Sequence, residues 1–252
     1  MAPLIAGNWK MNGFGREAEA LAQAIRDGAD GIGCELLVCP PAVALAQVAA
    51  VLAGSRVMLG GQDCHAEPSG AHTGDISAPM LRDAGASWVI LGHSERRADH
   101  HETDDLVRHK VIAAAAEGLT PIVCVGETED QRQAGQETET VGWQIAGSLP
   151  KDFAGVLAYE PCWAIGSGHT PTADEIAAMH LFIREELRRE LGPSGAAIRI
   201  LYGGSVKPAN AAEVLAVPEV AGALVGGASL LAADFLAIAR AASALSKAPS
   251  RV

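Results

Sequence analysis

The sequence has 252 residues, 49% of them hydrophobic, and its 30 acidic residues outnumber 19 basic ones, giving a net charge of −11. This composition predicts a globular protein with a substantial core and excludes a nucleic-acid binder, because binding to a phosphate backbone needs a basic surface. The first residues lack a basic region followed by an apolar stretch, so we expect no signal peptide. The longest apolar run, residues 42–54, is too short to cross a membrane. Five cysteines without CxxC spacing indicate reduced thiols and a cytoplasmic protein.

Short apolar runs alternate along the chain with longer segments of helical period. The predicted strands are residues 4–9, 35–39, 57–61, 88–91, 120–125, 155–160, 197–202 and 222–225. The clearest predicted helices are residues 16–26, 42–53, 104–117, 172–191, 208–215 and 232–245. Thr172 and Glu175 have the spacing of a capping box, which indicates a helix start. Several strands are continuous apolar runs, as expected where crossover helices bury both faces of a parallel sheet.

Eight strand–helix units in about 250 residues match the size of a closed (β/α)₈ barrel. We therefore predict an α/β fold in which residues 1–252 form a single (β/α)₈ TIM barrel domain. The alternative is an open, doubly wound sheet. Such a sheet usually carries a glycine-rich phosphate turn after its first strand, and Gly7-Asn8-Trp9-Lys10 is not that turn.

Side chains just past the carboxyl ends of barrel strands face the active site. Four polar residues hold such positions in the predicted barrel: Asn8, Lys10, His93 and Glu160. Glu160 ends an apolar strand, so burial should raise the pKa of its carboxyl toward that of a useful general base. His93 precedes what looks like a helix start, where a neutral imidazole is favoured over the cation. Position alone equally allows Glu160 to be a solvent-exposed ion-pair partner, and for Lys10 taken in isolation it favours an ordinary surface lysine.

Glycine-rich loops follow the last three predicted strands, at residues 166–168, 203–204 and 226–227. Glycine allows backbone N–H groups to approach an oxyanion closely, so such loops can hold a phosphate. A single loop of this kind more often marks only a tight turn. Two of these loops follow strands seven and eight, where barrel phosphate sites commonly lie, and this placement favours a phosphorylated ligand.

Two other chemistries are disfavoured by the pattern of histidines and cysteines. His100-His101-Glu102 has neither an HExxH motif nor a Cys/His ligand spacing, so we predict no metal site. Cys124 lies inside an apolar strand and is expected to be a small core residue rather than a nucleophile.

The chain closely resembles the triosephosphate isomerase family over essentially its whole length. The resemblance is carried by motifs that each lie at a strand end, in the family's order: Gly7-Asn8-Trp9-Lys10-Met11-Asn12, Gly92-His93-Ser94-Glu95-Arg96-Arg97, Cys124-Val125-Gly126-Glu127, Tyr159-Glu160-Pro161, Trp163-Ala164-Ile165-Gly166, Tyr202-Gly203-Gly204-Ser205-Val206 and Leu224-Val225-Gly226-Gly227-Ala228-Ser229-Leu230.

The resemblance implies a cofactor-independent glycolytic and gluconeogenic isomerase that interconverts dihydroxyacetone phosphate and D-glyceraldehyde 3-phosphate through an enediolate. Glu160 would move the carbon-bound proton, neutral His93 would polarise the carbonyl, and Lys10 and Asn8 would bind substrate and stabilise developing negative charge. Glu95 would lie behind Lys10 and orient it. The backbone N–H groups that would hold the phosphate belong to Gly166, Ser205, Gly226 and Gly227.

The family's lid and its dimer loop also have counterparts. The lid would comprise Pro161, Cys162, Trp163, Ala164, Ile165, Gly166, Ser167, Gly168, His169 and Thr170. The dimer loop would comprise His72, Thr73, Gly74 and Asp75, with Thr73 reaching the partner's site, so the resemblance implies a homodimer without nucleic-acid or membrane partners. His72 stands where the family often has an aromatic residue, and Cys162, His169 and Pro171 depart from the usual lid hinges.

Two other functions remain alternatives at this stage. A phosphate-binding aldolase of the Schiff-base type needs a lysine at a middle or late strand end, and Lys10 and Lys207 are poorly placed for that role. A scaffold that has kept the fold without catalysis is the other, and the fold alone does not exclude it.

Overall fold

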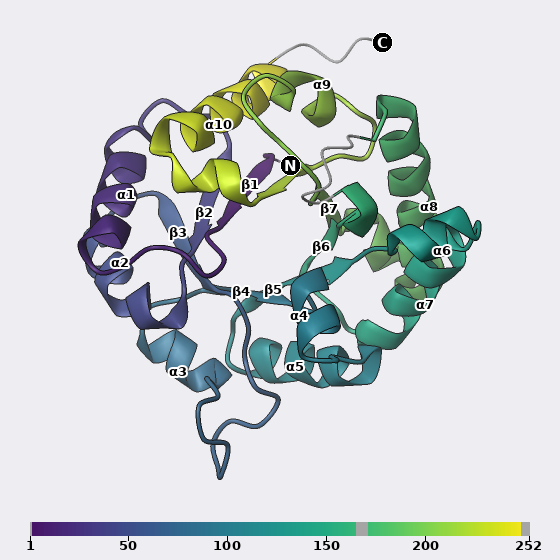
Figure 1. Cartoon of the computed structure of the whole chain (residues 1–252), viewed down its shortest axis with the longest axis horizontal. Helices are drawn as coiled ribbons and strands as arrows, with labels where there is room; N and C mark the ends of the chain where they lie inside the picture. Colours follow the sequence, from purple (N-terminus) through teal and green to yellow (C-terminus); the bar gives the residue numbers. More distant parts are fainter. Residues whose placement is uncertain (1, 165–170, 248–252) are drawn as a thin grey trace.

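The computed structural model describes residues 2–164 and 171–247, and the side chains up to residue 245. Eight parallel strands form a closed barrel in which each strand pairs with the next and β1 pairs with β8 (Figure 1). The strands are β1 (Leu4–Asn8), β2 (Glu35–Cys39), β3 (Val57–Gly61), β4 (Trp88–Leu91), β5 (Thr120–Val125), β6 (Val156–Tyr159), β7 (Arg199–Tyr202) and β8 (Gly222–Val225). The predicted (β/α)₈ barrel is therefore confirmed.

Helices surround the barrel on its outside (Figure 1). They are α1 (Arg16–Asp27), α2 (Leu45–Leu52), α3 (Ala78–Asp83), α4 (Ser94–Asp99), α5 (Asp104–Ala116), α6 (Glu129–Gln133), α7 (Glu137–Ser148), α8 (Ala173–Leu191), α9 (Ala211–Leu215) and α10 (Ala232–Lys247). Short 3₁₀ turns are η1 (Ala42–Ala44), η2 (Cys162–Ala164), η3 (Gly192–Ala197) and η4 (Gly227–Leu230). Among the described residues, no helix has both the length and the apolar character that a membrane span requires.

The core has two layers because successive side chains of a strand point to opposite faces. Leu4 and Ala6 of β1 belong to a cluster inside the barrel, whereas Ile5 packs outward against the helices. Both layers are almost completely buried, which explains why the strands read as continuous apolar runs.

Most predicted strand bounds agree with the structure, and the differences lie at strand ends. β6 ends at Tyr159, so Glu160 lies just past the strand instead of within it. β7 begins only at Arg199, because the 3₁₀ turn η3 occupies the residues before it. α9 begins three residues later than predicted, since the Asn210 side chain accepts a hydrogen bond from the Lys207 N–H and holds a turn there.

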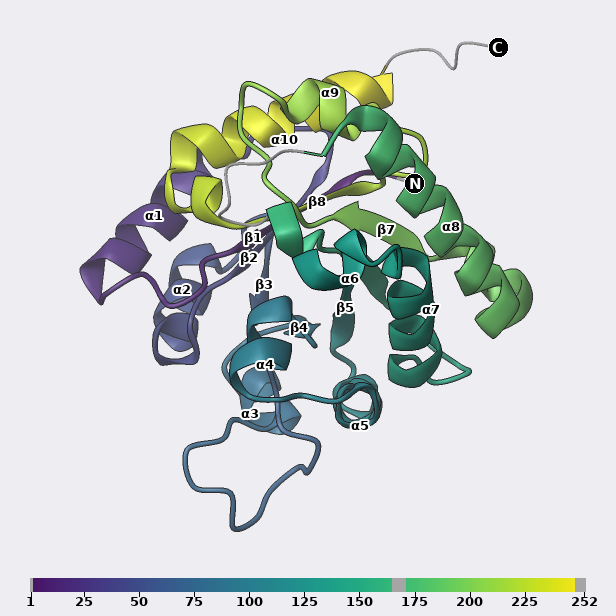
Figure 2. The same cartoon turned by 45° about the vertical axis from the view of Figure 1, so that its right-hand side comes forward.

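Helix α8 begins as its sequence predicts. Thr172 accepts the N–H of Glu175, and the Glu175 carboxylate accepts the N–H of Thr172, so the expected capping box is confirmed. The chain between β3 and α3 does not pack against the barrel along its whole length. It projects as a long loop away from the barrel (Figures 1 and 2).

Candidate active site

A cavity of about 490 Å³ opens where the strands end, and it collects the sequence-predicted residues from distant parts of the chain. Its lining includes Asn8, Lys10, His93, Glu160, Ser205, Gly226 and Gly227. Gly166 lies outside the described residues. Strand ends from both termini of the chain are needed to build this cavity, because β1 and β8 are neighbours in the closed barrel.

Glu160 and His93 form a buried pair at the base of this cavity. The Nε2 atom of His93 lies 2.8 Å from Oε1 of Glu160, and Oε2 accepts the backbone N–H of Ser94 at 2.9 Å. Glu160 is 2% exposed and His93 is 5% exposed. Both oxygens of the carboxylate are thus paired with protein groups.

The pKa of Glu160 is lower than usual, so the prediction of a raised pKa is wrong for this arrangement. Burial does raise the pKa, and it is the largest single influence. The charge and hydrogen bond of His93, the N–H of Ser94 and the charge of Lys10 together outweigh it. The sequence argument considered burial alone, without the partners that the fold brings to the carboxylate.

The ring of His93 carries its proton on the side that faces Glu160. Its Nδ1 atom accepts the backbone N–H of Glu95 at 3.2 Å, so the neutral ring is protonated on Nε2 and donates to the carboxylate. Burial lowers the pKa of His93, but the charge of Glu160 raises it above the usual value of 6.5. His93 is therefore expected to be neutral once Glu160 moves away from the ring, because the negative charge of that carboxylate is what favours the imidazolium cation.

Lys10 has a strained backbone that a neighbouring side chain holds in place. Its φ of 50° lies in the left-handed region, which is unfavourable for a residue with a side chain. Its N–H donates to Oδ1 of Asn8, and its carbonyl accepts Nε2 of Gln62 at 2.9 Å. The Lys10 ammonium lies 2.5 Å from Oε1 of Glu95, the geometry needed for Glu95 to orient it. Gln62 was missed by the sequence analysis because a single amide after a strand carries no motif.

The glycine-rich loops at residues 203–204 and 226–227 line the same cavity. A side chain on Gly203 would come within 2.8 Å of Cγ of Glu160, so this position requires glycine for close approach. Within the described part of the chain, the N–H groups of Gly204 and Ser205 donate to no protein acceptor, which leaves them available to an oxyanion. Lys207 and Asp234 also line the cavity, and the sequence analysis did not include them in the site.

The turn that follows Glu160 is anchored by Glu127. The N–H of Cys162 donates to the Glu127 carbonyl at 3.1 Å, and the indole Nε1 of Trp163 donates to its carboxylate at 2.8 Å. Burial and the charge of Glu160 raise the pKa of the Cys162 thiol to about 12, which disfavours the nucleophilic thiolate. Of the predicted lid, Pro161, Cys162, Trp163 and Ala164 are described, and residues 165–170 lie outside the described residues.

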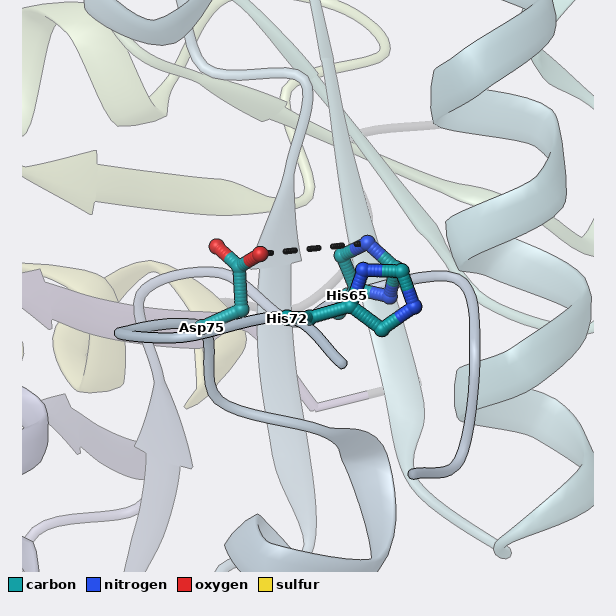
Figure 3. A group of neighbouring side chains, drawn as sticks. All are labelled: His65, His72 and Asp75. Carbon is teal, nitrogen blue, oxygen red and sulfur yellow. Dashed lines mark ion pairs between the residues drawn. The ribbon is translucent and has the colours of Figure 1, made fainter. Parts of the chain in front are cut away.

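The predicted dimer loop lies in the projecting segment between β3 and α3, and its residues His72, Thr73, Gly74 and Asp75 are exposed. The rings of His65 and His72 stack with centroids 4.0 Å apart, and Asp75 faces His65 (Figure 3). These residues offer possible metal-ligand atoms within 4.8 Å of one another. However, Nδ1 of His65 accepts the N–H of Glu67, which puts the proton of the neutral ring on Nε2, where Asp75 lies at 3.9 Å. A metal at Nε2 would have to displace that proton, so the absence of a metal site stays our prediction.

A closed barrel with a carboxylate, an imidazole and an ammonium beside glycine-rich loops defines a (β/α)₈-barrel enzyme that moves protons on a phosphorylated substrate. The comparison with known families makes this class specific. The family model for triosephosphate isomerase matches residues 3–242, and the chain belongs to that family.

Individual triosephosphate isomerases align with the chain over nearly their full lengths. The chain is 64% identical over 249 residues to a triosephosphate isomerase of Granulibacter bethesdensis, an alignment that covers 96% of the chain and 100% of the relative. It is 57% identical over 253 residues to the enzyme of Acidiphilium cryptum, covering 96% and 99%. A crystal structure of triosephosphate isomerase from Bartonella henselae superposes with a TM-score of 0.89 at 47% identity and covers 96% of this chain and 99% of that one.

Proposed function

We propose that Glu160, His93, Lys10 and Asn8 are the catalytic residues of an intramolecular aldose–ketose isomerase. As a member of its family, the chain interconverts dihydroxyacetone phosphate and D-glyceraldehyde 3-phosphate. The observation that carries the residue assignment is the 2.8 Å contact between Glu160 and His93 in the cavity that also holds Lys10 and the glycine-rich loops. Proton transfer between two carbons and two oxygens needs one base at carbon and one donor at oxygen, and this pair supplies both.

In the proposed reaction, the substrate separates Glu160 from His93. The Glu160 carboxylate takes a proton from the carbon beside the carbonyl, and the C–H electron pair forms the enediolate. His93 donates its Nε2 proton to the carbonyl oxygen and recovers a proton from the other oxygen. The protonated Glu160 then returns its proton to the neighbouring carbon, so no atom is gained or lost. Once Glu160 has left its donors, burial raises its pKa toward that of an effective base.

Two features support the stabilisation of negative charge on the substrate. The Lys10 ammonium and the Asn8 amide belong to the cavity wall near the reacting pair, and we assign them to the developing enediolate charge. We assign the phosphate to the backbone N–H groups of Gly166, Ser205, Gly226 and Gly227. Residues 161–170 are proposed to close over the substrate, which protects an enediol phosphate from loss of phosphate to water.

The quaternary and cellular context is also proposed. The exposed loop that contains Thr73 would insert into a second copy of the chain, giving a homodimer in which each loop reaches its partner's site. The five free cysteines fit a cytoplasmic location. Residues 1–252 would form a single domain that works without a cofactor or metal.

The assignment is tested with Glu160→Gln, which keeps the size and hydrogen-bonding capacity of the side chain but removes the base. We expect its kcat for glyceraldehyde 3-phosphate to fall by about two to four orders of magnitude. Glycerol 3-phosphate, which has the phosphate but no carbonyl, should still bind, as measured by calorimetry. Glu117→Gln, at an exposed position after α5, is the matched control and should retain wild-type kcat. Equal turnover by Glu160→Gln and wild type would show that another residue is the base.

A further inference from the structure

Glu127 is a fully buried carboxylate that holds the start of the predicted lid. Its Oε1 atom accepts the Tyr159 hydroxyl at 3.0 Å, the Trp163 indole N–H at 2.8 Å and Nη1 of Arg132 at 3.3 Å. Its Oε2 atom is buried and, among the described residues, has no hydrogen-bond partner. A carboxylate in such a place needs a compensating cation, because burying an unpaired charge is strongly unfavourable.

Arg132 is that cation, and it touches three elements at once. From α6, its guanidinium lies 4.3 Å above the ring of Trp163, the geometry of a cation–π contact. Its Nη2 atom lies 2.7 Å from Oε1 of Glu175, which also caps the first turn of α8. Arg132 therefore links Trp163, within the first residues of the predicted lid, to Glu175 after it, on the side of the barrel where α6 and α8 lie (Figure 1).

The turn that Arg132 holds leads directly from the proposed base. Glu160 is fixed on one side by its own N–H, which donates to the carbonyl of Val125 at 2.8 Å. On the other side, the N–H of Cys162 is fixed to the carbonyl of Glu127. Displacement of Glu127 or of Trp163 would thus move the backbone within two or three residues of the reacting carboxylate. A misplacement of about 1 Å can lower a rate by about a hundredfold.

We propose that Arg132 is a positioning residue for the isomerase: it clamps Trp163 against Glu127 and the start of α8, and so fixes the turn that carries Glu160 into the site. The proposal rests on the assignment of Glu160 as the base. Arg132 is not among the described residues that line the cavity. Its effect on the reaction is transmitted through Glu127 and Trp163.

The charges around Arg132 predict how its loss changes the pH dependence. Burial raises the pKa of Glu127, and the charge of Arg132 opposes that rise. Among the described residues, Tyr159 and Trp163 donate the other hydrogen bonds to this carboxylate, and the acidic Glu175 of α8 pairs with Arg132. Without Arg132 the pKa of Glu127 rises further, so the carboxylate takes up a proton at a higher pH than in the wild type. The protonated group holds the indole N–H less strongly, and activity falls as pH decreases.

The test compares Arg132→Met, which keeps an apolar stem over Trp163, with Arg132→Lys, which keeps the positive charge. Arg132→Met should lower kcat/KM by about ten- to a hundredfold, mainly through kcat, and should shift the acidic limb of its pH profile to higher pH. Arg132→Lys should keep the acidic limb near its wild-type position. Adding Glu127→Gln to Arg132→Met should abolish the shift, since the titrating group is gone. Arg108→Met, which removes a surface arginine paired with Asp105, is the matched control and should behave as wild type.

A purely structural role would lower the melting temperature of Arg132→Met while leaving kcat per folded molecule and the pH profile unchanged, and that result overturns the proposal. If Arg132→Met does not fold, a wild-type kcat in Arg132→Lys combined with Glu127→Gln overturns it equally, because that variant lacks both the guanidinium and the carboxylate of the clamp. The Trp163 indole resonance, identified with Trp163→Phe, gives a readout without substrate and should shift in Arg132→Met. An inactive wild type, or a Glu160→Gln variant as active as wild type, refutes the proposed function instead. If only the Arg132 proposal is wrong, the wild type is still active and Glu160→Gln is still inactive.

Discussion

The Glu160–His93 pair and a second group of charges, of which two are buried and two partly buried, differ in the kind of cation that each carboxylate meets. The second group, which we call the charged cluster, consists of Asp63, Arg96, Glu102 and Lys110. In it the Lys110 ammonium lies 2.5 Å from Glu102 and 2.8 Å from Asp63, and Arg96 contacts both carboxylates. Glu102 and Glu160 each have side chains only 2% exposed, so burial does not distinguish them.

The difference lies in whether the proton can move. Lysine and arginine keep their charge near neutral pH, so the charged cluster is a set of fixed ions that stabilises one arrangement of the chain. Histidine gains or loses a proton near neutral pH, and the partner of Glu160 is therefore able to exchange one during a reaction. Buried carboxylates thus become candidates for catalysis through the titration of their partner, not through burial alone.

The largest expected effect is on the pair. His93→Gln keeps a hydrogen-bond donor for Glu160 but cannot shuttle a proton, so kcat should fall by about two to four orders of magnitude. The free energy of unfolding, measured with urea, should change much less. A variant that unfolds in place of losing turnover would mean that the pair, like the charged cluster, mainly stabilises the fold.

The reverse pattern is expected for the charged cluster. Lys110→Met removes the ammonium from the buried Glu102 and the partly buried Asp63 and leaves them only Arg96, so the protein should lose about 3–5 kcal/mol of stability while the folded fraction keeps its kcat. Lys151→Met is the control, because Lys151 pairs with Glu190 on the surface and its side chain is 81% exposed. A specific loss of kcat in Lys110→Met at full folding would contradict the division between the two groups.

The pH dependence of stability sharpens the comparison. The pKa of His93 is raised in the folded protein, so its contribution is fully present below its usual value of 6.5 and is lost as pH rises through the folded value. The stability difference between wild type and His93→Gln should therefore be larger at about pH 6 than at about pH 8.5. The pKa of Glu102 is lowered, so its contribution is complete above the usual value of 4.5 and is lost only at lower pH. In urea titrations, the difference in free energy of unfolding between wild type and Glu102→Gln should therefore change much less between about pH 6 and about pH 8.5.

The smallest expected effect concerns long-range attraction of the substrate. The net charge is −11, the Lys10 ammonium is paired with Glu95, and Asp234 shares the cavity wall with Lys207. These charges nearly cancel at the cavity mouth, so kcat/KM should change by less than about threefold between low and physiological ionic strength. A steep fall with added salt, followed by stopped-flow capture of substrate, would show that the cavity attracts anions through its field.

The fold was predictable because its signal is spread over many residues. Strands buried on both faces must be apolar throughout, and the run from Ile122 to Val125 in β5 carries that pattern without help from distant parts of the chain. The polar helices α6 and α7 were not singled out, since residues such as Glu129 and Thr138 give no clear apolar stripe.

The sequence predicted which residues form most of the site, but it did not predict how their pKa values shift. Strand-end positions identified Glu160 and His93, yet the direction of the Glu160 pKa depends on contacts made across 66 residues of sequence. Gln62 and Arg132 escaped notice for the same reason. Each acts through a contact that exists only after folding, and neither residue type has a distinctive spacing that would identify it beforehand.

Closure of the barrel between β1 and β8 also governs when the protein can work during its synthesis. Asn8 and Lys10 leave the ribosome first, but Gly226 and Gly227 of the same cavity leave among the last residues. A nascent chain that ends before β8 therefore exposes the hydrogen-bonding edge of β1 and lacks part of the wall that would receive an anion. Catalytic competence arrives in one late step, when the last strand joins the first.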